Sequence, residues 1–317
     1  MQKLPFRTLA PWLRATYGRE VHRVALDAGS TCPNRDGTKG LGGCTYCDVE
    51  GSGTGALKTG QDLDEQLEAG LRRVRRRGEG VGVMAYLQSY TNTYVDPGRF
   101  EEVLARLEPR IGEGRELLGL SLATRPDCLP DAALDRLAEL AQRGPVWLEL
   151  GLESASDRVL FDINRLHTVA EFEDAVRRAH ERGLLTVGHA ILGLPGDGRE
   201  GARRTAEALA RSGVSGVKVH HLMVLKRTQM AAQWRRGELE VLDAETYVQW
   251  LADFIERLDP DQILHRITGD SPSENLLAPF WEIHKNAVRE RVAAELGGRG
   301  TRQGSLFART DRAGHSG

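Results

Sequence analysis

Short β-branched runs alternate with amphipathic stretches along most of the chain, and this alternation limits the possible folds more than any other feature. In the amphipathic stretches, apolar residues recur at helical spacing, and each stretch separates two strand-like runs. Such strand, helix, strand units predict a parallel sheet with right-handed crossovers. The strand-like runs are 21–28, 81–87, 117–123, 146–150, 184–192 and 216–225, and the helical stretches are 61–78, 97–111, 130–143, 168–182 and 198–211.

A parallel sheet of this kind either stays open and doubly wound or curls toward a barrel. Six units are too few to close a barrel, so we predict an α/β fold, a partial (β/α)6 TIM-like barrel with parallel strands. Beyond residue 232 the repeat stops, and helices at 243–258 and 279–296 predict a small helical C-terminal extension. The predicted divisions are an N-terminal lead (1–20), the barrel (21–232), the extension (233–296) and a glycine- and arginine-rich tail (297–317) that we expect to be disordered.

The overall charge and hydropathy exclude several classes of protein. The formal net charge of −2 gives no global field for nucleic acid, so contact with RNA would require a local patch. No run approaches 18 uninterrupted apolar residues, and residues 1–18 lack the apolar core of a signal peptide. We therefore expect a cytoplasmic protein that does not enter a membrane.

Three of the four cysteines, Cys32, Cys44 and Cys47, lie within sixteen residues that follow the first strand-like run. Their C-x11-C-x2-C spacing, with glycines at 40, 42 and 43, lets the backbone fold closely around an inorganic group. Three thiols without a nearby fourth ligand predict a metal or cluster site with one open position. Two alternatives remain: a disulfide with a spare thiol, and structural zinc completed by a distant histidine, for which His22 is the nearest candidate. Cys128 is interpreted as a small half-buried hydrophobe.

Polar or glycine-rich segments also follow the other strand-like runs. They are 88–94, 124–127, 151–154 and 193–196. In parallel α/β folds the carboxyl ends of the strands meet at one edge, where ligands bind. Together with the cysteine loop, these segments predict a cofactor pocket at that edge.

These motifs resemble a known family. The cysteine loop, the Tyr-Thr-Asn-Thr-Tyr and Thr-Arg-Pro-Asp-Cys-Leu segments, Glu-x-Gly-x-Glu-Ser at 149–154, Asn-Arg-Leu-His-Thr at 164–168 and Gly-Leu-Pro-Gly at 193–196 look like those of radical S-adenosylmethionine (SAM) enzymes. Within that superfamily the chain is similar to the YhcC/YtqA-like subgroup, which is related to the radical SAM domain of the elongator catalytic subunit. The likeness extends from the cysteine loop to the region of Trp281.

The resemblance implies a 4Fe-4S cluster bound by Cys32, Cys44 and Cys47, with SAM on the fourth iron. A flavodoxin- or ferredoxin-like donor would supply the electron that cleaves SAM to methionine and a 5′-deoxyadenosyl radical. The residues that it implies for cofactor binding are Tyr46, Glu153, Arg165, Gly193, Pro195 and Gly196, and those at the reacting centre are Gln88, Tyr90, Asn92 and Arg125. Relatives usually carry glutamine at position 153 and glycine at 166, where this chain has Glu153 and Leu166.

The resemblance further implies modification of a tRNA wobble uridine, so tRNA is the candidate partner. Radical chemistry on a small metabolite or a protein is an alternative, and a non-catalytic zinc-containing RNA-binding module is a third reading. The arginine run at 72–77 is either a phosphate-binding patch or a solvated helix end. Lys218, His220, His221 and Lys226 are candidates for substrate contact. The sequence predicts neither the oligomeric state nor the product.

Overall fold

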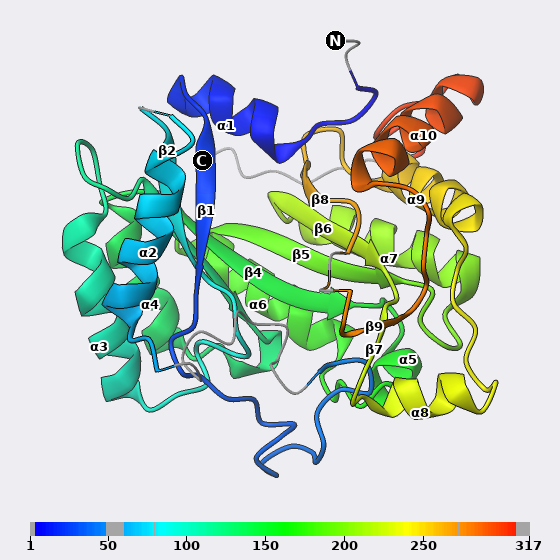
Figure 1. Ribbon diagram of the computed structural model, residues 1–317, viewed down its shortest axis with the longest axis horizontal. Helices are drawn as coiled ribbons and strands as arrows, with labels where there is room; N and C mark the ends of the chain where they lie inside the picture. The colour runs from blue at the N-terminus through cyan, green and yellow to red at the C-terminus, as the bar shows by residue number, and fades with distance from the viewer. Residues whose placement is uncertain (1–3, 49–59, 79, 270, 272, 309–317) are drawn as a thin grey trace.

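The structure, a computed structural model, describes residues 4–48, 60–78, 80–269, 271 and 273–308. Its centre is a curved parallel sheet of seven strands in the order β1-β2-β3-β4-β5-β6-β8 (Figure 1). A short antiparallel pair, β7 and β9, lies beside it. The strands are β1 (Val21–Leu26), β2 (Gly82–Leu87), β3 (Gly119–Thr124), β4 (Val146–Glu153), β5 (Leu185–Leu192), β6 (Gly216–His221), β7 (Val224–Leu225), β8 (Ile263–Arg266) and β9 (Leu276–Ala278).

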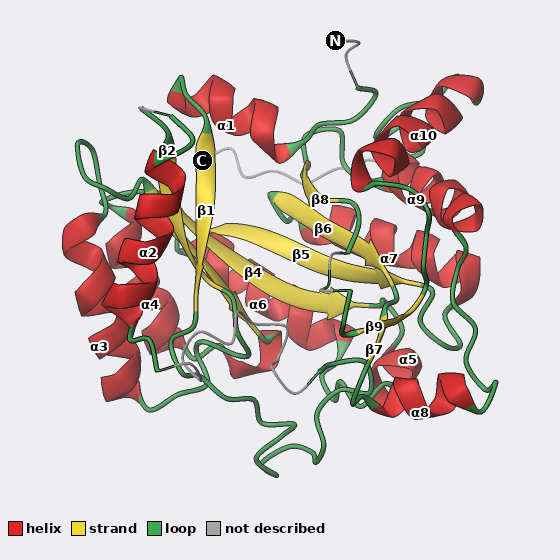
Figure 2. Ribbon diagram, viewed as in Figure 1, coloured by secondary structure: helices red, strands yellow, loops and turns green. Residues whose placement is uncertain are grey.

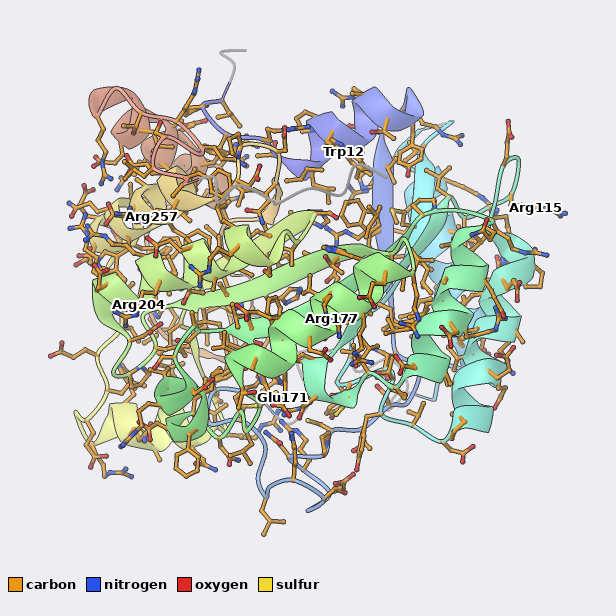
Figure 3. All side chains as sticks on the ribbon, turned by 180° about the vertical axis from the view of Figure 1, so that it is seen from behind. Trp12, Arg115, Glu171, Arg177, Arg204 and Arg257 are labelled. Carbon is orange, nitrogen blue, oxygen red and sulfur yellow. The ribbon has the colours of Figure 1, made fainter. Side chains whose placement is uncertain are left out.

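Helices cover the convex face of the sheet, as the front and rear views show (Figures 2 and 3). Arg177 on α6 and Arg204 on α7 point outward from this layer in Figure 3. The helices are α1 (Leu9–Tyr17), α2 (Leu63–Arg75), α3 (Pro97–Leu107), α4 (Asp131–Ala141), α5 (Asp157–Asp162), α6 (Val169–Glu181), α7 (Gly198–Ser212), α8 (Gln229–Arg235), α9 (Ala244–Arg257) and α10 (Lys285–Gly298). Single 3₁₀ turns lie at Glu108–Arg110 and Pro126–Cys128.

Local sequence signals explain where the main helices begin. Both α2 and α6 start with a capping box, formed by Asp62 with Glu65 and by Thr168 with Glu171. Each of these helices then buries one apolar stripe against the sheet. Gly70 on α2 allows especially close packing, because a Cβ atom there would lie 2.1 Å from Val24 on β1.

The two faces of the strands differ in chemistry. Along β1, Val24 and Leu26 are buried in the apolar core beneath the helices, whereas Arg23 and Ala25 face the interior of the partial barrel. This alternation follows from the two-residue period of a strand. The concave side of the sheet is therefore free to carry polar groups.

The predicted fold class is confirmed: all six predicted strands are present and parallel, and the sheet is a partial barrel. The C-terminal extension also supplies a seventh strand, β8, that the sequence pattern did not reveal. The predicted run 216–225 is two strands, because the chain leaves the sheet after His221 and pairs again as β7 with β9. The last helix begins at Lys285 rather than at 279. The division into barrel and extension at residue 232 stays a prediction.

The tail beyond residue 296 differs from our expectation of disorder. Helix α10 continues to Gly298, and Gln303 is buried, with hydrogen bonds to the lead segment and to residues that follow α9. The correction applies to residues 297–308, which backbone and side-chain hydrogen bonds fix against α9. Residues 309–317 lie outside the described residues. Among the described helices, none has the length and apolar character needed to cross a membrane.

Candidate active site

A cavity of about 640 Å³ opens on the concave side of the sheet, with walls from all seven of its strands. The cysteine-bearing segment, drawn in blue below β1 in Figure 1, closes its outer end. Among the sequence-predicted site residues, those on the cavity wall are Cys32, Cys44, Tyr46, Cys47, Gln88, Tyr90, Arg125, Glu153 and Arg165. The pocket expected at the carboxyl edge of the sheet is therefore present.

All three predicted cysteine ligands are free thiols on this wall, and Cys32 and Cys44 are buried. Polar side chains contact two of the sulfur atoms: Arg35 Nη2 lies 3.3 Å from Cys47 Sγ, and Asn34 Nδ2 lies 3.7 Å from Cys44 Sγ. Burial, with Cys44 as a further cause, raises the pKa of the Cys47 thiol to about 11. A metal bound here would replace that proton, as metals do at thiolate sites.

Two asparagines fasten the cysteine loop to the segment that follows α5. Asn34 Nδ2 donates to the carbonyl oxygens of Asn164, at 2.5 Å, and Arg165, at 3.1 Å. In return, Asn164 Nδ2 donates to the carbonyl oxygens of Leu41, at 3.1 Å, and Gly43, at 2.7 Å. These reciprocal bonds hold Arg165 at a fixed position relative to the cysteines.

Backbone strain is concentrated around this cavity. Among the described non-glycine residues with positive φ are Tyr90 (57°), Glu153 (68°), Asn164 (55°) and Leu166 (59°). Only glycine adopts this conformation without a steric cost, so the four side chains are held there by their surroundings. Strained residues persist where the surrounding structure over-determines them, which is common at functional sites.

Arg165 is buried and lacks a full set of partners. Its Nη2 atom lies 3.6 Å from Glu153 Oε1 and donates to the Gly151 carbonyl oxygen at 3.4 Å, whereas its Nε atom contacts no hydrogen-bond acceptor among the described residues. A Cβ atom on Gly151 would lie only 2.4 Å from the Arg165 guanidinium, so glycine there keeps the space open. Arg125 is better partnered: its Nε and Nη2 bind the two carboxylate oxygens of Asp127 at 2.9 and 2.8 Å, and Nη2 also binds the Arg165 carbonyl oxygen at 2.7 Å. Only its buried Nη1 has no acceptor in the described part of the chain.

These unpaired donors fit the predicted cofactors. The buried Arg165 guanidinium, with a free N–H donor, matches a carboxylate such as that of SAM, because carboxylates form charge-assisted hydrogen bonds with arginine. A 4Fe-4S cluster needs cysteines on separate irons. In the described ranges no group of three or more His, Cys, Asp or Glu side chains is arranged to hold a single metal ion. The zinc alternative stays a prediction that metal analysis of the purified protein tests.

The remaining predicted residues occupy different positions. Asn92 is buried beside the cavity, where its Nδ2 donates to the backbone oxygens of Leu87, Ser89 and Ala123. These bonds join β2 to β3, and Asn92 is not part of the cavity wall, so its role at the reacting centre stays a prediction. The wall does not include Gly193, Pro195 or Gly196. Contact between their backbone and a cofactor stays a prediction.

Other sequence candidates also differ in placement. Lys218 and His220 line the cavity, but Lys226 does not, and the His221 ring packs on Trp281 with ring centroids 4.0 Å apart. Cys128 lies in a separate surface cavity of about 410 Å³. The arginine run ends α2, at the amino edge of the sheet and away from the cysteine loop, and Arg75 pairs there with Glu116.

A group of five cavity-lining residues deeper in the barrel was not identified as a unit from the sequence. This inner cluster consists of Arg23, Tyr86, Glu149, His189 and Lys218, which come from β1, β2, β4, β5 and β6. Glu149, fully buried, lies 2.8 Å from Arg23 Nη1 and 3.2 Å from His189 Nε2, and Lys218 Nζ also donates to it. The available signal was a polar or ionisable residue within each of these largely apolar strands.

Charges in the inner cluster shift each other's protonation. Burial alone would raise the pKa of Glu149, but Lys218, His189 and Arg23 outweigh it and hold this pKa well below its ordinary value. Burial lowers the pKa of Lys218 to about 7 despite the opposing effect of Glu149. Such perturbed groups in a cavity mark candidates for function.

Comparison with known proteins identifies the family. The family model of the radical SAM superfamily matches residues 31–209, and that of the Radical_SAM C-terminal domain matches residues 214–297. YtqA of Bacillus subtilis (strain 168) is 40% identical over 310 residues, which make up 96% of this chain and 94% of YtqA. A tRNA uridine(34) acetyltransferase of Dehalococcoides mccartyi is 26% identical over 176 residues, 55% of this chain but only 38% of that protein.

A solved structure shares the fold. The archaeal Elp3 of Methanocaldococcus infernus superimposes with a TM-score of 0.70 at 17% identity, and the match covers 89% of this chain and 64% of that chain. Because a family model covers more than half of the sequence and YtqA matches nearly all of it, the chain belongs to the radical SAM superfamily, whose enzymes use a 4Fe-4S cluster and SAM.

Proposed function

We propose that this radical SAM enzyme modifies a uridine at the wobble position of tRNA. The observation that carries the proposal is a local excess of positive charge in the cavity. Its wall has six arginine or lysine side chains and three aspartate or glutamate side chains, although the whole chain has a formal net charge of −2. Such a basic region attracts nucleic acid independently of sequence.

The similar proteins suggest tRNA as the substrate. The acetyltransferase is named for uridine 34 of tRNA, and the part of this chain that resembles it includes more than half of the residues. The Elp3 structure supports a shared barrel. The proposal concerns the radical step on the uridine and does not include acetyl transfer.

Several groups in the outer half of the cavity have proposed roles in this chemistry. When bound, the cluster and SAM supply a 5′-deoxyadenosyl radical that abstracts a hydrogen atom from the substrate. Cys32, Cys44 and Cys47 would hold the cluster, and Asn34 and Arg35 donate hydrogen bonds toward its sulfur ligands. A flavodoxin- or ferredoxin-like protein is the proposed electron donor. We place the reaction in the cytoplasm, where cysteine ligands stay reduced.

Arg165 and Glu153 complete the cofactor end of the site. Arg165 would bind the SAM carboxylate through the N–H donors that the protein leaves free, and Glu153 would accept from the amino group or the ribose hydroxyls. Gln88, Tyr90 and Arg125 lie on the same wall and would contact the reacting centre. Arg35 fixes Tyr90, since its guanidinium carbon lies 5.6 Å from the centre of the tyrosine ring.

The first experiment tests the radical chemistry anaerobically. Wild-type protein reconstituted with iron and sulfide should convert SAM to 5′-deoxyadenosine in the presence of dithionite, and Cys44→Ala should not. Cys128→Ala is a matched control, because Cys128 lies outside the cavity wall and should leave the reaction intact. Bound zinc and no deoxyadenosine in the wild type would contradict the assignment.

The second experiment tests the substrate. Unmodified and partly modified tRNA is added to the same reaction, and nucleosides are then analysed by mass spectrometry. We expect faster 5′-deoxyadenosine formation, a mass change at the wobble uridine, and binding that weakens as salt increases. Stimulation by a small-metabolite or protein fraction, with none by tRNA, would favour the alternative substrate classes.

A further inference from the structure

The inner cluster has more hydrogen-bond donors than the protein uses. Lys218 has three N–H donors, of which one binds the Tyr86 hydroxyl oxygen at 3.0 Å and one binds Glu149. Arg23 has five, of which one binds Glu149 among the described residues. Both side chains line the cavity, so their remaining N–H groups are available to a bound molecule.

The charge of the cluster is also unbalanced. Glu149 is its one carboxylate, whereas Arg23 and Lys218 are both cationic when protonated, and Arg266 on the neighbouring β8 adds a further positive charge to the same wall. His189 and Tyr86 contribute no negative charge at neutral pH. An anion placed between Arg23 and Lys218 would restore the balance and accept the free N–H donors.

A purely structural role explains this arrangement poorly. Burying an ion pair costs free energy, and apolar side chains of similar volume often replace such pairs with no loss of stability. Glu149 satisfies the cations only in part, but it does hold Arg23 and Lys218 in place from the back of the cavity. Retaining two cations around one carboxylate is useful if a second acid group arrives with the substrate.

The position of the cluster suits a substrate rather than SAM. The Arg165 guanidinium and the Glu153 carboxylate lie against Gly151, two residues after Glu149 on β4, so at about 3.3 Å per residue the inner cluster is roughly 7 Å deeper in the barrel than that pair. We propose that the inner end of the cavity binds an anionic group of the substrate, a carboxylate or a phosphate, between Arg23 and Lys218. The inference deepens the proposed function, because this group would belong to the molecule that is modified.

Equilibrium binding of small probes tests the proposal without turnover. The reconstituted holoprotein with SAM is titrated by calorimetry with 5-carboxymethyluridine, with its isosteric amide 5-carbamoylmethyluridine, and with inorganic phosphate. If the substrate anion is a carboxylate, the acid binds at least tenfold more tightly than the amide. If it is a phosphate, inorganic phosphate binds and the acid and amide do not differ.

Two variants separate charge from structure. Arg23→Gln should abolish the tenfold preference or the phosphate binding, whereas Arg23→Lys keeps the positive charge and should retain most of it. Arg158→Gln, on the exposed surface of α5, should change neither. Circular dichroism checks that each variant folds, and the wild-type titrations decide the question even if one does not.

The outcomes distinguish this proposal from the tRNA assignment. Equal affinities for acid and amide, with no binding of phosphate, would overturn the anion site. Anion binding that depends on Arg23, in an enzyme that leaves tRNA unmodified, would retain the site and refute the proposed substrate.

Discussion

At the scale of single residues, Arg165 tests the cofactor end of the site. Its guanidinium is buried, and its Nε atom finds no acceptor among the described residues. Replacing it by glutamine removes a charge-assisted pair with the SAM carboxylate, which is typically worth about 1.5–3 kcal/mol. We expect Arg165→Gln to weaken SAM binding roughly 10- to 100-fold, measured by equilibrium dialysis with reconstituted protein. Arg158→Gln is the matched control, and an affinity within twofold of wild type would contradict the role of Arg165.

Residue roles could be predicted from the sequence only in part. The three cysteines were recognisable because thiols at that spacing have few alternative uses. The structural contacts of Asn92 were not evident, because the sequence does not show that three backbone carbonyls on β2, β3 and the loop between them accept hydrogen bonds from its amide. The inner cluster was missed as a unit because its members are far apart in sequence, and only the sheet register brings Glu149 beside Lys218.

At the scale of elements, the loops after β4 and β5 are joined by one buried contact. Ser154 Oγ donates to Asp197 Oδ1 at 3.0 Å, just before α7 begins. Burial raises the pKa of Asp197 to about 6, although the bond from Ser154 acts in the opposite direction. The carboxyl is therefore easier to bury protonated than ionised.

This shift predicts a pH dependence of stability. Since the folded pKa of Asp197 exceeds the unfolded value of 3.8, its contribution is fully present below about pH 4 and is lost as the pH rises through about 6. Asp197→Asn copies the neutral acid, so we expect it to stabilise the protein by on the order of 1–2 kcal/mol at pH 7–8 and to have little effect at pH 4. Urea unfolding of both proteins between pH 4 and 8 measures this difference. A difference that does not change with pH would disprove the assignment, and the exposed Asp162→Asn should show none.

Strands were predicted correctly where apolar runs and helices alternate regularly, and the short strand β8 was missed. The six strands of the repeat were evident because apolar runs and amphipathic helices alternate regularly. β8 has only four residues, among them His265 and Arg266, so its local pattern carries no strand signal. It joins the sheet because β6 offers a free edge at Gly216 and Val217. Tertiary pairing, rather than propensity, determines this strand.

At the scale of the whole molecule, the two ends of the described chain meet at the β8 edge. The backbone N–H of Leu264 on β8 binds the carbonyl oxygen of Arg7 at 3.0 Å, and that of Gln303 binds the carbonyl oxygen of Pro5 at 2.9 Å. The Gln303 side chain adds three bonds: it accepts from Arg7 N at 2.9 Å and donates to the carbonyl oxygens of Asp259 and Gln262, both at 2.7 Å. Composition predicted disorder here because glycine and arginine dominate the tail, but one buried amide can order such a segment.

Gln303 therefore provides a test of how far the tail stabilises the barrel. Gln303→Ala removes three hydrogen bonds and leaves buried backbone groups unpaired, so we expect the free energy of unfolding to fall by about 2–3 kcal/mol. Chemical unfolding followed by circular dichroism measures this loss. Gln142→Ala is the matched control, because Gln142 is exposed at the end of α4 and should change stability by less than about 0.5 kcal/mol. If the two variants have the same free energy of unfolding, the tail does not stabilise the fold. If only Gln303→Ala lowers the free energy of unfolding, residues 297–308 stabilise the barrel.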